Sequence, residues 1–367
     1  MTKSRFSSLG EVIGFCTSNN YPFALYRLPG ERQIHCVASR SPKAALEGGL
    51  PFPSAPGFIF HPFQPDKNHP VNFIAADIHF SCLYRDMEPK EISAEYNFDI
   101  PESINPETPK ELYCTKVQEA VDAVKKEKLK KVILSRVQSV RGIKKQPVEL
   151  FMELCGMFGA AFLSLVYIPG SVTWLTVSPE LLIYSNKKEM MTAALAGTKQ
   201  PNGNWTEKEI KEQQLVSDYI RKIVEKHCSG IKVSAPSDTL AGSITHLKTS
   251  FSAQLDSGFW DLVTELHPTP AVCGIPKAEA LKFIAKTELH DRKYYSGYLG
   301  PYNIDGETNF FVNLRCAQLM HGRADLFVGG GITDESSPAA EWEETVMKAN
   351  TLLPVLNPVS QPKVEYL

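Results

Sequence analysis

Short apolar runs separated by turn residues are the feature that most constrains this chain. Before residue 90 the runs are PFALYRLP, IHCVAS, GFIFHPF and NFIAADIHF, and a second set between residues 160 and 185 is AAFLSLVYI, VTWLTVS and ELLIYS. Runs of this length, rich in β-branched and aromatic residues, predict strands. The first set predicts an antiparallel sheet over residues 1–90. The short links in the second set predict a strand meander, because parallel neighbours need a long crossover connection.

Helical spacing alternates with these strands. Four helices are predicted over Leu112–Lys130, Glu149–Cys155, Thr206–Cys228 and Ala339–Leu353, the last followed by Pro354. Residues 97–109 hold three prolines and several acids, which predicts a linker or an exposed loop. Asp305-Gly306 lies between two apolar runs and predicts a hairpin turn. The predicted fold class is therefore α+β with antiparallel sheets.

Composition excludes several classes of function. The 39 Lys and Arg residues are balanced by 41 Asp and Glu residues, and a net charge of −2 predicts neither a nucleic-acid partner nor a membrane-surface partner. No apolar run approaches the roughly 18 residues that a membrane span needs. The N-terminal residues lack the apolar stretch of a signal peptide, so we expect a cytoplasmic protein. The eight cysteines form no CxxC pair, which predicts reduced thiols and no zinc site.

Two predicted helices carry carboxylates at helical spacing. Glu341, Glu344 and Lys348 share one face of the last helix, beside an apolar stripe that should pack inward: Trp342, Val346, Ala349 and Leu353. Glu209 and Glu212 repeat the spacing on the helix that begins near Thr206. Taken alone, each pair is explained by a solvated face, with an ion pair from Glu344 to Lys348. Taken together, the two pairs are also the oxygen ligands that Mg²⁺ prefers.

The run Gly329-Gly330-Gly331 ends a predicted strand just before the last helix. Consecutive glycines let a backbone approach an anionic ligand closely, although a sharp turn explains them equally well. The run matches neither a dinucleotide fingerprint nor a P-loop, so no nucleotide is implied.

Several longer motifs occur in a fixed order over residues 110–355. They are LKKVILSR (129–136), VSPELLIY (177–184), ALAGTKQ (194–200), THL (245–247), LHPTPAVCGIPKAEA (266–280), RKYYSGYLG (292–300), NLRCAQL (313–319) and SSPAAEWEET (336–345). Through them the chain resembles the chorismate-utilising enzymes, a group of isochorismate, salicylate, anthranilate and aminodeoxychorismate synthases. The match is best to the isochorismate synthases.

The resemblance implies a fold as well as a chemistry. It implies two antiparallel sheets with surrounding helices that enclose a central active site. Residues 110–355 would be the chorismate-binding catalytic core, and residues 1–100 a strand-rich N-terminal part of the same structural domain. The implied activity is a Mg²⁺-dependent isomerisation: water attacks the ring of chorismate, the double bonds shift, and the original hydroxyl leaves two carbons away.

By resemblance, Lys131 is the base that activates water and Glu180 is the general acid. A lysine base must be partly neutral, so burial or nearby cations must lower its pKa, and a general acid needs a raised pKa. The position before VILSR selects Lys131 over Lys130. From the residues alone, Lys131 is explained as a surface lysine and Glu180 as an acid at a strand edge.

The resemblance also implies the binding residues. Glu212 and Glu344 would hold Mg²⁺, supported by Glu209 and Glu341, and the metal would hold the ring carboxylate of chorismate. The second carboxylate would meet four residues: Arg315, Tyr295, Lys348 and Gly329. Gly197 and Thr198 would line the side of the leaving hydroxyl, and His267 would shape the pocket. Taken alone, Arg315 fits a structural ion pair and His267 a structural histidine.

Two positions depart from the pattern of the family. Gln213 follows Glu212 where many relatives have a histidine, and Lys199 follows the Leu-Ala-Gly-Thr motif where an arginine is usual. Neither change removes a charge that we assign to the chemistry, but both bear on the surroundings of the metal and the pocket.

Within the family, water is the expected nucleophile. Ala196 stands where the aminodeoxychorismate enzymes carry a lysine, and we expect no glutaminase partner. The main alternative is a salicylate synthase, which would go on to eliminate pyruvate. A non-catalytic chorismate-binding paralogue is less favoured, because the four residues assigned to the chemistry are present: Lys131, Glu180, Glu212 and Glu344. A metal-dependent hydrolase is also less favoured, because neither carboxylate helix supplies a histidine as a metal ligand. We expect a monomer that serves menaquinone synthesis in preference to siderophore synthesis.

Overall fold

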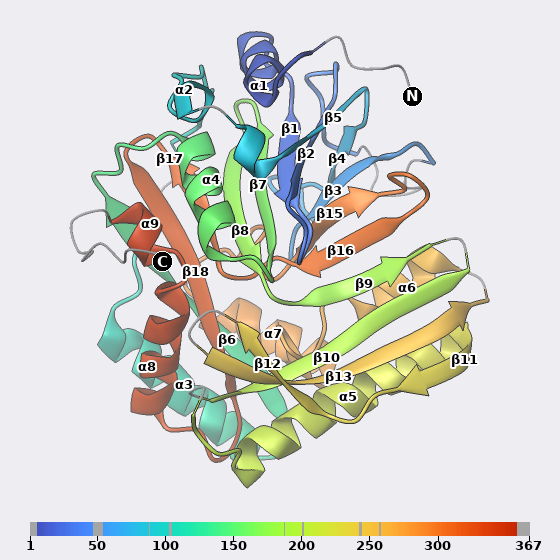
Figure 1. The fold of residues 1–367 in the computed structure, drawn as a ribbon. Helices are drawn as coiled ribbons and strands as arrows, with labels where there is room; N and C mark the ends of the chain where they lie inside the picture. Colours follow the sequence, from blue (N-terminus) through green and yellow to red (C-terminus); the bar gives the residue numbers. More distant parts are fainter. Residues whose placement is uncertain are drawn as a thin grey trace.

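The polypeptide forms two antiparallel sheets with helices packed on them (Figure 1). The structure is a computed structural model, and it describes residues 6–46, 54–87, 89–102, 105–186, 188–199, 202–241, 244–256 and 258–357. None of the described helices is long and apolar enough to cross a membrane.

Sheet A has nine strands among the described residues. Their order is β14 (Gly274–Ile275), β6 (Lys131–Arg141), β18 (Arg323–Ile332), β17 (Cys316–Met320), β8 (Val172–Ser178), β7 (Phe162–Ile168), β1 (Phe23–Arg27), β2 (Gln33–Ala38) and β5 (Ile78–Leu83). The longest pairing joins β6 and β18, and it runs from Arg323 opposite Arg141 to Ile332 opposite Val132.

Sheet B contains the remaining described strands. Its order is β11 (Cys228–Val233), β13 (Ile244–Leu255), β10 (Glu189–Lys199), β9 (Leu181–Ser185), β16 (Thr308–Val312), β15 (Tyr298–Tyr302), β3 (Gly57–His61) and β4 (Asn72–Ala75), with β12 (Ser237–Ala241) also paired to β13. The described strand pairs of both sheets are antiparallel, which confirms the predicted fold class.

Helices cover the outer faces of the sheets. They are α1 (Leu9–Ser18), α2 (Pro89–Ile92), α3 (Lys110–Lys125), α4 (Pro147–Met157), α5 (Glu207–His227), α6 (Phe259–Leu266), α7 (Lys277–Thr287), α8 (Pro338–Ala349) and α9 (Leu353–Leu356), with a short 3₁₀ turn at Tyr84–Asp86. Figure 1 shows α5 running along β10 and β13, and α3 and α8 beside the β6 end of sheet A.

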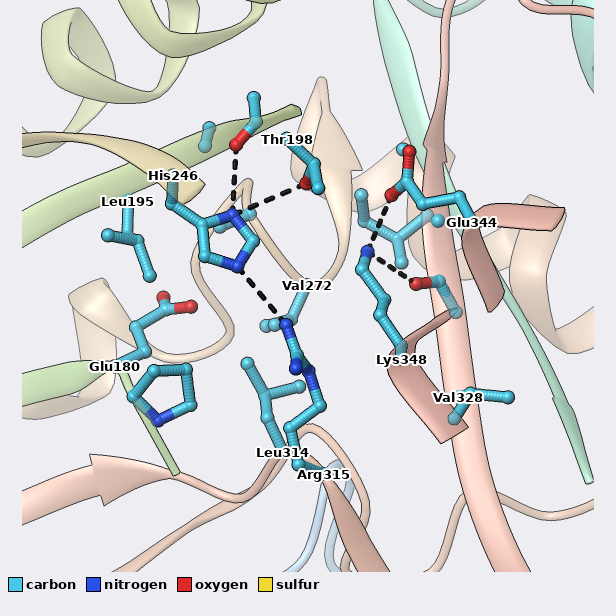
Figure 2. Close-up of a pocket in the computed structure, with 18 of the residues that line it drawn as sticks. Glu180, Leu195, Thr198, His246, Val272, Leu314, Arg315, Val328, Glu344 and Lys348 are labelled. Atoms are coloured by element: carbon cyan, nitrogen blue, oxygen red, sulfur yellow. Dashed lines mark hydrogen bonds and ion pairs between the residues drawn. The ribbon is translucent and has the colours of Figure 1, made fainter. Parts of the chain in front are cut away.

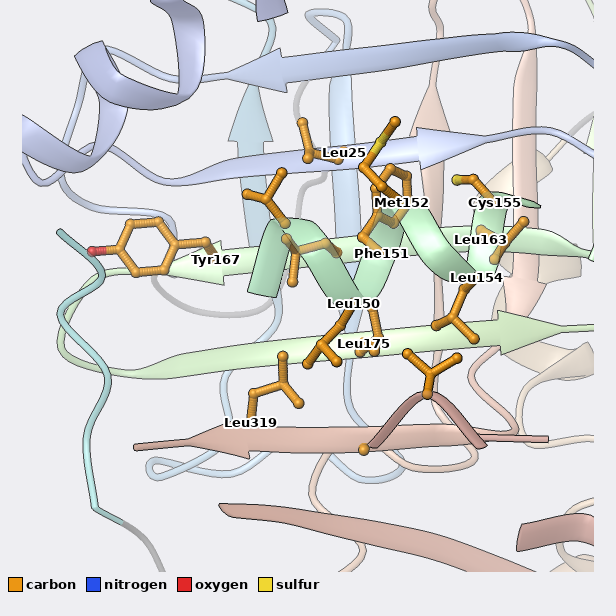
Figure 3. Close-up of a cluster of buried hydrophobic side chains, with 14 of the residues drawn as sticks. Leu25, Leu150, Phe151, Met152, Leu154, Cys155, Leu163, Tyr167, Leu175 and Leu319 are labelled. Atoms are coloured by element: carbon orange, nitrogen blue, oxygen red, sulfur yellow. The ribbon is translucent and has the colours of Figure 1, made fainter. Parts of the chain in front are cut away.

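The core follows from the alternation of side chains along each strand. On β8, Leu175 points outward into a cluster with α4, and Trp174 points inward to the layer between the sheets. Figure 3 shows Leu150, Phe151 and Leu154 of α4 packed against strand side chains, among them Leu163 and Leu175. The inner layer is mostly aromatic, with Phe60 stacked on Tyr294 and Phe162 on Phe311.

Residues 1–100 and residues 110–355 each contribute strands to both sheets. From the first 100 residues, β1, β2 and β5 join sheet A, and β3 and β4 join sheet B. The prediction of a single antiparallel sheet over residues 1–90 was therefore wrong, because neighbouring runs such as β4 and β5 belong to different sheets. The sharing of strands supports our proposal that residues 1–100 and 110–355 form one structural domain.

The predicted meander was also wrong at its third strand. β7 and β8 pair in sheet A, but β9 pairs with β10 and β16 in sheet B. Pro179 follows β8 and has no backbone N–H to extend a strand ladder. The carbonyl of Glu180 instead accepts a hydrogen bond from the Val312 amide of sheet B. The crossing therefore places Glu180 between the two sheets.

A second crossing runs in the opposite direction. The predicted hairpin is present as β15 and β16, with Asp305 and Gly306 at positive φ in its turn. The chain then leaves sheet B after Val312 and enters sheet A at Cys316. The Asn313 side chain fixes this crossing, because its oxygen accepts hydrogen bonds from Trp174 and Thr176 of β8. Arg315 lies in the crossing and is thus also between the sheets.

The other predicted elements differ mainly at their ends. The predicted helix over Thr206–Cys228 is α5, with these two residues as its caps, but α3 ends at Lys125 and α8 at Ala349. Pro354 lies in the separate α9. The described residues of 97–109 contain no helix or strand, as predicted.

The sheet A core makes a prediction about stability. Leu175 is completely buried, so Leu175→Ala should lower the free energy of unfolding by about 2–5 kcal/mol through the lost contacts and the cavity left behind. The measurement is denaturant unfolding followed by circular dichroism. Leu289→Ala is the control, because Leu289 is 60% exposed and its loss should cost less than about 0.5 kcal/mol. Equal midpoints for the two variants would contradict this account of the core.

Candidate functional site

A cavity lies where the two crossings, β6, β18, α5 and α8 meet. Ten of the thirteen residues that the sequence pointed to line it: Lys131, Glu180, Gly197, Thr198, Glu212, Tyr295, Arg315, Gly329, Glu344 and Lys348. Figure 2 shows Glu180 on one side of this space, with Glu344 and Lys348 on the other.

Lys131 begins β6 and is completely buried. Lys130, the residue just before the strand, is exposed, whereas Lys131 is buried. The Lys131 Nζ lies 2.8 Å from Oε1 of Glu212 on α5. Lys131 is therefore no surface lysine, and its Nζ is held beside one of the two candidate metal carboxylates.

Glu180 is a buried carboxyl group at the first crossing. Burial raises its pKa to about 8, while Lys131, the Thr269 hydroxyl and Lys348 act in the opposite direction. A carboxyl group in this state can hold its proton near neutral pH and give it to a leaving oxygen. The interpretation of Glu180 as an ordinary strand-edge acid does not fit this environment.

The three glycines of β18 form a wall of the cavity. A Cβ atom at Gly331 would lie 2.6 Å from Oε1 of Glu212, and one at Gly330 would lie 2.9 Å from Oε2 of Glu341. A Cβ atom at Gly329 would lie 2.8 Å from the hydroxyl of Tyr295. The glycines sit within a strand and not in a sharp turn, so their role is to admit these side chains.

Helix α8 presents its charged face to the glycine wall. Lys348 Nζ lies 2.6 Å from Oε1 of Glu344 and donates a hydrogen bond to the carbonyl of Gly329. The pair predicted between Glu344 and Lys348 is present, but it lies in the cavity and not on a solvated face. The buried line of α8 is Glu341, Thr345 and Ala349, so the predicted inward stripe through Trp342 and Val346 is displaced by one residue.

His246 on β13 joins two walls of the cavity (Figure 2). Its Nε2 lies 3.1 Å from a guanidinium nitrogen of Arg315, which can only donate, so Nε2 must accept. Nδ1 then carries the proton and donates to the carbonyl of Gly197 at 2.9 Å. Burial, followed by the charges of Arg315 and Lys348, lowers the pKa of His246 to about 3. The imidazole is therefore neutral, and it links Arg315 to the carbonyl of Gly197.

Gly197 supplies the other end of this link through a β-bulge. The register between β10 and β13 shifts between Ala196 and Thr198, and Gly197 has φ of +73°. Glycine adopts a positive φ without the strain that a side chain brings. Helix α5 also packs so closely that a Cβ atom at Gly197 would lie 3.0 Å from the Cβ atom of Glu209. The bulge turns the Gly197 carbonyl and the Thr198 hydroxyl toward His246.

Arg315 has no carboxylate partner among the described residues. It donates hydrogen bonds to the hydroxyl of Thr351 and to His246, and burial lowers its pKa to about 10, still far above neutral pH. The interpretation as a structural ion pair is therefore wrong. A buried guanidinium without an anion is a fitting partner for a carboxylate of a ligand.

Three expected site residues do not line the cavity. Glu209 accepts hydrogen bonds from the amide and hydroxyl of Thr206 in the capping box of α5. Glu341 lies behind Gly330 and accepts a hydrogen bond from Ser336. His267 packs edge-on against Tyr298, with Nε2 3.1 Å from the carbonyl of Phe63.

The two departures from the family pattern also point away from the cavity. Gln213 is buried and donates a hydrogen bond to Thr249 of β13. Lys199 forms an ion pair with Asp238 at 2.8 Å and lies over the ring of Trp205.

Sequence reasoning assigned no role to two residues that act at the site. His246 lines the cavity, and the Thr269 hydroxyl acts on the pKa of Glu180. Both lie within the motifs THL and LHPTPAVCG, so the motifs marked their location. A single histidine or threonine in a strand or loop carries no local pattern that would reveal its partners.

Glu212 and Glu344 are suited to hold a divalent metal ion. They come from two helices, their side chains are 13% and 22% exposed, and both face the backbone of the glycine wall. Carboxylate oxygens with room for water are the ligands that Mg²⁺ prefers. In each carboxylate, Oε1 lies beside a lysine: Lys131 for Glu212 and Lys348 for Glu344.

Comparison with known proteins identifies relatives of this chain. The sequence model of the family described as "Chorismate binding enzyme" matches residues 76–357. The "Salicylate biosynthesis isochorismate synthase" of Pseudomonas aeruginosa is 33% identical over 259 residues, which cover 66% of this chain and 54% of that protein. "Isochorismate synthase EntC" of Escherichia coli is 34% identical over 196 residues, covering 49% of this chain and 50% of that protein. The chain thus spans about half the length of these curated relatives.

Solved structures share the fold over nearly the whole chain. The menaquinone-specific isochorismate synthase MenF of Escherichia coli superposes with a TM-score of 0.77 at 20% identity, covering 97% of this chain and 92% of that one. Anthranilate synthase component I of Streptococcus pneumoniae superposes with a TM-score of 0.67 at 17% identity, covering 96% and 94%. At these identities the likeness bears on the fold alone.

The glycine wall makes a prediction about metal binding. Gly331→Ala would place a methyl group against the Glu212 carboxylate and 3.0 Å from Lys131 Cε, so Mg²⁺ affinity should fall about tenfold or more, or ~1.4 kcal/mol. Isothermal titration with Mg²⁺ alone measures this. Gly14→Ala is the control, since nothing lies within 4 Å of a Cβ atom there. A folded Gly331→Ala protein with wild-type affinity would refute the assignment of Glu212.

Proposed function

This chain belongs to the chorismate binding enzyme family, and we propose that it is an isochorismate synthase, an isomerase that converts chorismate to isochorismate with Mg²⁺. The observation that carries the proposal is one cavity in which a buried carboxyl group, Glu180, and a buried lysine, Lys131, lie beside two candidate metal carboxylates, with burial raising the pKa of Glu180 to about 8. We further propose a cytoplasmic monomer that acts in menaquinone synthesis and needs no glutaminase subunit.

The charges of the cavity suit a substrate with two carboxylates. Lys348 and Arg315 supply two cations, Glu212 and Glu344 supply two anions, Glu180 holds a proton, and Lys131 would act as the base in its neutral form. Arg315, Lys348 and the Tyr295 hydroxyl would bind the carboxylate of the enolpyruvyl arm. Glu212 and Glu344 would hold Mg²⁺, which when bound would neutralise the ring carboxylate of chorismate.

Lys131 would take a proton from the attacking water, and Glu180 would give its proton to the departing hydroxyl. Both groups are held in place before substrate arrives: Lys131 by the start of β6 and by Glu212, and Glu180 by the crossing between the sheets. Thr198 and the Gly197 bulge would face the hydroxyl that leaves, with His246 keeping both in position. Apolar neighbours, among them Leu195, Val272 and Leu314, would restrict bulk water.

The test is to identify the product. Purified protein is mixed with chorismate and Mg²⁺, with EDTA in a parallel sample, and the products are separated by chromatography. We expect isochorismate that depends on Mg²⁺. Lys131→Ala should bind chorismate yet give no product, which ties the activity to this cavity. Salicylate with equimolar pyruvate would identify a salicylate synthase instead, and no turnover would leave a chorismate-binding paralogue.

The pKa of Glu180 makes a prediction about pH. Glu180 donates a proton, and with a pKa of about 8 its protonated fraction falls as pH rises through 8, so kcat/KM should decline above about pH 8. The Thr269 hydroxyl lowers this pKa, so Thr269→Val should move the alkaline limb to higher pH. The measurement is kcat/KM for chorismate across the pH range.

Thr264→Val is the matched control, because Thr264 is exposed on α6 and hydrogen-bonds only to its own helix at Trp260. An alkaline limb that stays in place in Thr269→Val, or that moves equally in Thr264→Val, would contradict the role of Glu180.

A further inference from the structure

A buried ion pair that has no part in the proposed chemistry lies behind the cavity. Nε of Arg292 donates to Oε2 of Glu288 at 2.8 Å, and Nη2 donates to Oε1 at 2.6 Å. The two side chains are 3% and 4% exposed, and neither residue lines the cavity. Removing two charges from water is costly, so their further contacts indicate what the pair does.

Arg292 contacts three separate walls of the cavity from outside. It donates hydrogen bonds to the carbonyl of Ile133 on β6 at 2.9 Å and to the carbonyl of Val272 at 2.8 Å. Its guanidinium carbon also lies 5.8 Å from the ring centre of Tyr295. Ile133, Val272 and Tyr295 all line the cavity and come from distant parts of the sequence.

The pair takes the place of a strand at the edge of sheet A. β14 pairs with β6 only at Lys131 and Val132, and one more hydrogen bond follows, from the Ile133 amide to Cys273. Beyond this point, Arg292 satisfies the carbonyl of Ile133, and Glu288 accepts hydrogen bonds from the amide and hydroxyl of Ser135. Side chains thus complete the hydrogen bonding of β6 where the neighbouring strand has ended.

We propose that Arg292 and Glu288 are positioning residues, which hold the strand of Lys131 and the segment of Val272 in the arrangement that the reaction requires. The inference rests on the proposed function. The pair reaches β6 two and four residues after Lys131, and it reaches the second segment three residues after Thr269.

A change in the position of these two segments should change the pKa of Glu180. The groups that act on it are Lys131 of β6, Thr269, and Lys348 of α8, and all three lower its pKa. Two of the three stand on the segments that Arg292 holds. A shift of both segments away from Glu180 would raise its pKa, whereas a general loss of stability would leave it unchanged.

The test is Arg292→Lys, which keeps the charge but cannot reach both carbonyl groups and Glu288 at once. We expect kcat to fall about 10–100-fold from misplacement of the reacting groups, with a smaller change in KM. We also expect the alkaline limb of kcat/KM to move to higher pH. Unchanged kcat and an unchanged limb in a folded variant would overturn the proposal.

Arg136→Lys is the matched control. Arg136 is an equally buried arginine on β6, the strand that Arg292 contacts, but its Nε donates to Thr345 of α8 and not to the carbonyl groups that Arg292 binds. It should lower the melting temperature to a similar extent without moving the alkaline limb. An equal shift of the limb in both variants would assign the effect to stability and overturn the proposal.

A second variant covers the case in which Arg292→Lys fails to fold. Glu288→Gln combined with Arg292→Met removes both charges, so neither is left buried without its partner. We expect this protein to fold and to show the same loss of kcat. Wild-type kcat in the double variant, or failure of both variants to fold, would overturn positioning. A wild-type protein that forms no isochorismate would instead refute the proposed function, and the positioning role with it.

Discussion

The close approach permitted by Gly329, Gly330 and Gly331 is the constraint on which the site depends. These residues lie on β18, which pairs with β6 along its whole length, so the wall they form cannot move independently of sheet A. A methyl group at any of the three would come within 2.6–2.9 Å of an oxygen of Glu212, Glu341 or Tyr295. Strand, helix and loop residues can therefore converge on one space only because this stretch of the strand has no side chains.

Enclosure between two sheets then determines the electrostatics. Away from the cavity, the layer between the sheets is filled by aromatic rings, and at the cavity it is filled by charged groups that have left bulk water. The same burial keeps His246 neutral and raises the pKa of Glu180. Lys131 and Lys348 are paired with carboxylates, but Arg315 is not paired with an acid among the described residues. A cavity with these properties can bind an anion and still supply a proton.

Sequence patterns predicted local structure well and long-range structure less well. The bounds of α5 and the Asp305-Gly306 turn were predicted correctly because their signals lie within a few residues. The division of strands between two sheets was missed, because β9 and β17 look like any other apolar run and only partners far along the chain decide their sheet. Sequence reasoning located ten cavity residues, seven of them within the motifs. His246 lies in the motif THL, but nothing in that motif reveals its partners, and Glu209 was misread because an acid at the third position of a helix also serves as a cap.

The central claim is that Lys131 activates a water molecule that attacks the chorismate ring, while Glu180, in the same cavity, gives a proton to the departing hydroxyl. Turnover of chorismate in water enriched with oxygen-18, followed by mass spectrometry of the product, tests this most directly. The account predicts isochorismate that carries one solvent oxygen in its new ring hydroxyl, and unlabelled hydroxyl released from the substrate. Isochorismate without the label would show that the hydroxyl moves within the molecule, and it would contradict the roles proposed for Lys131 and Glu180.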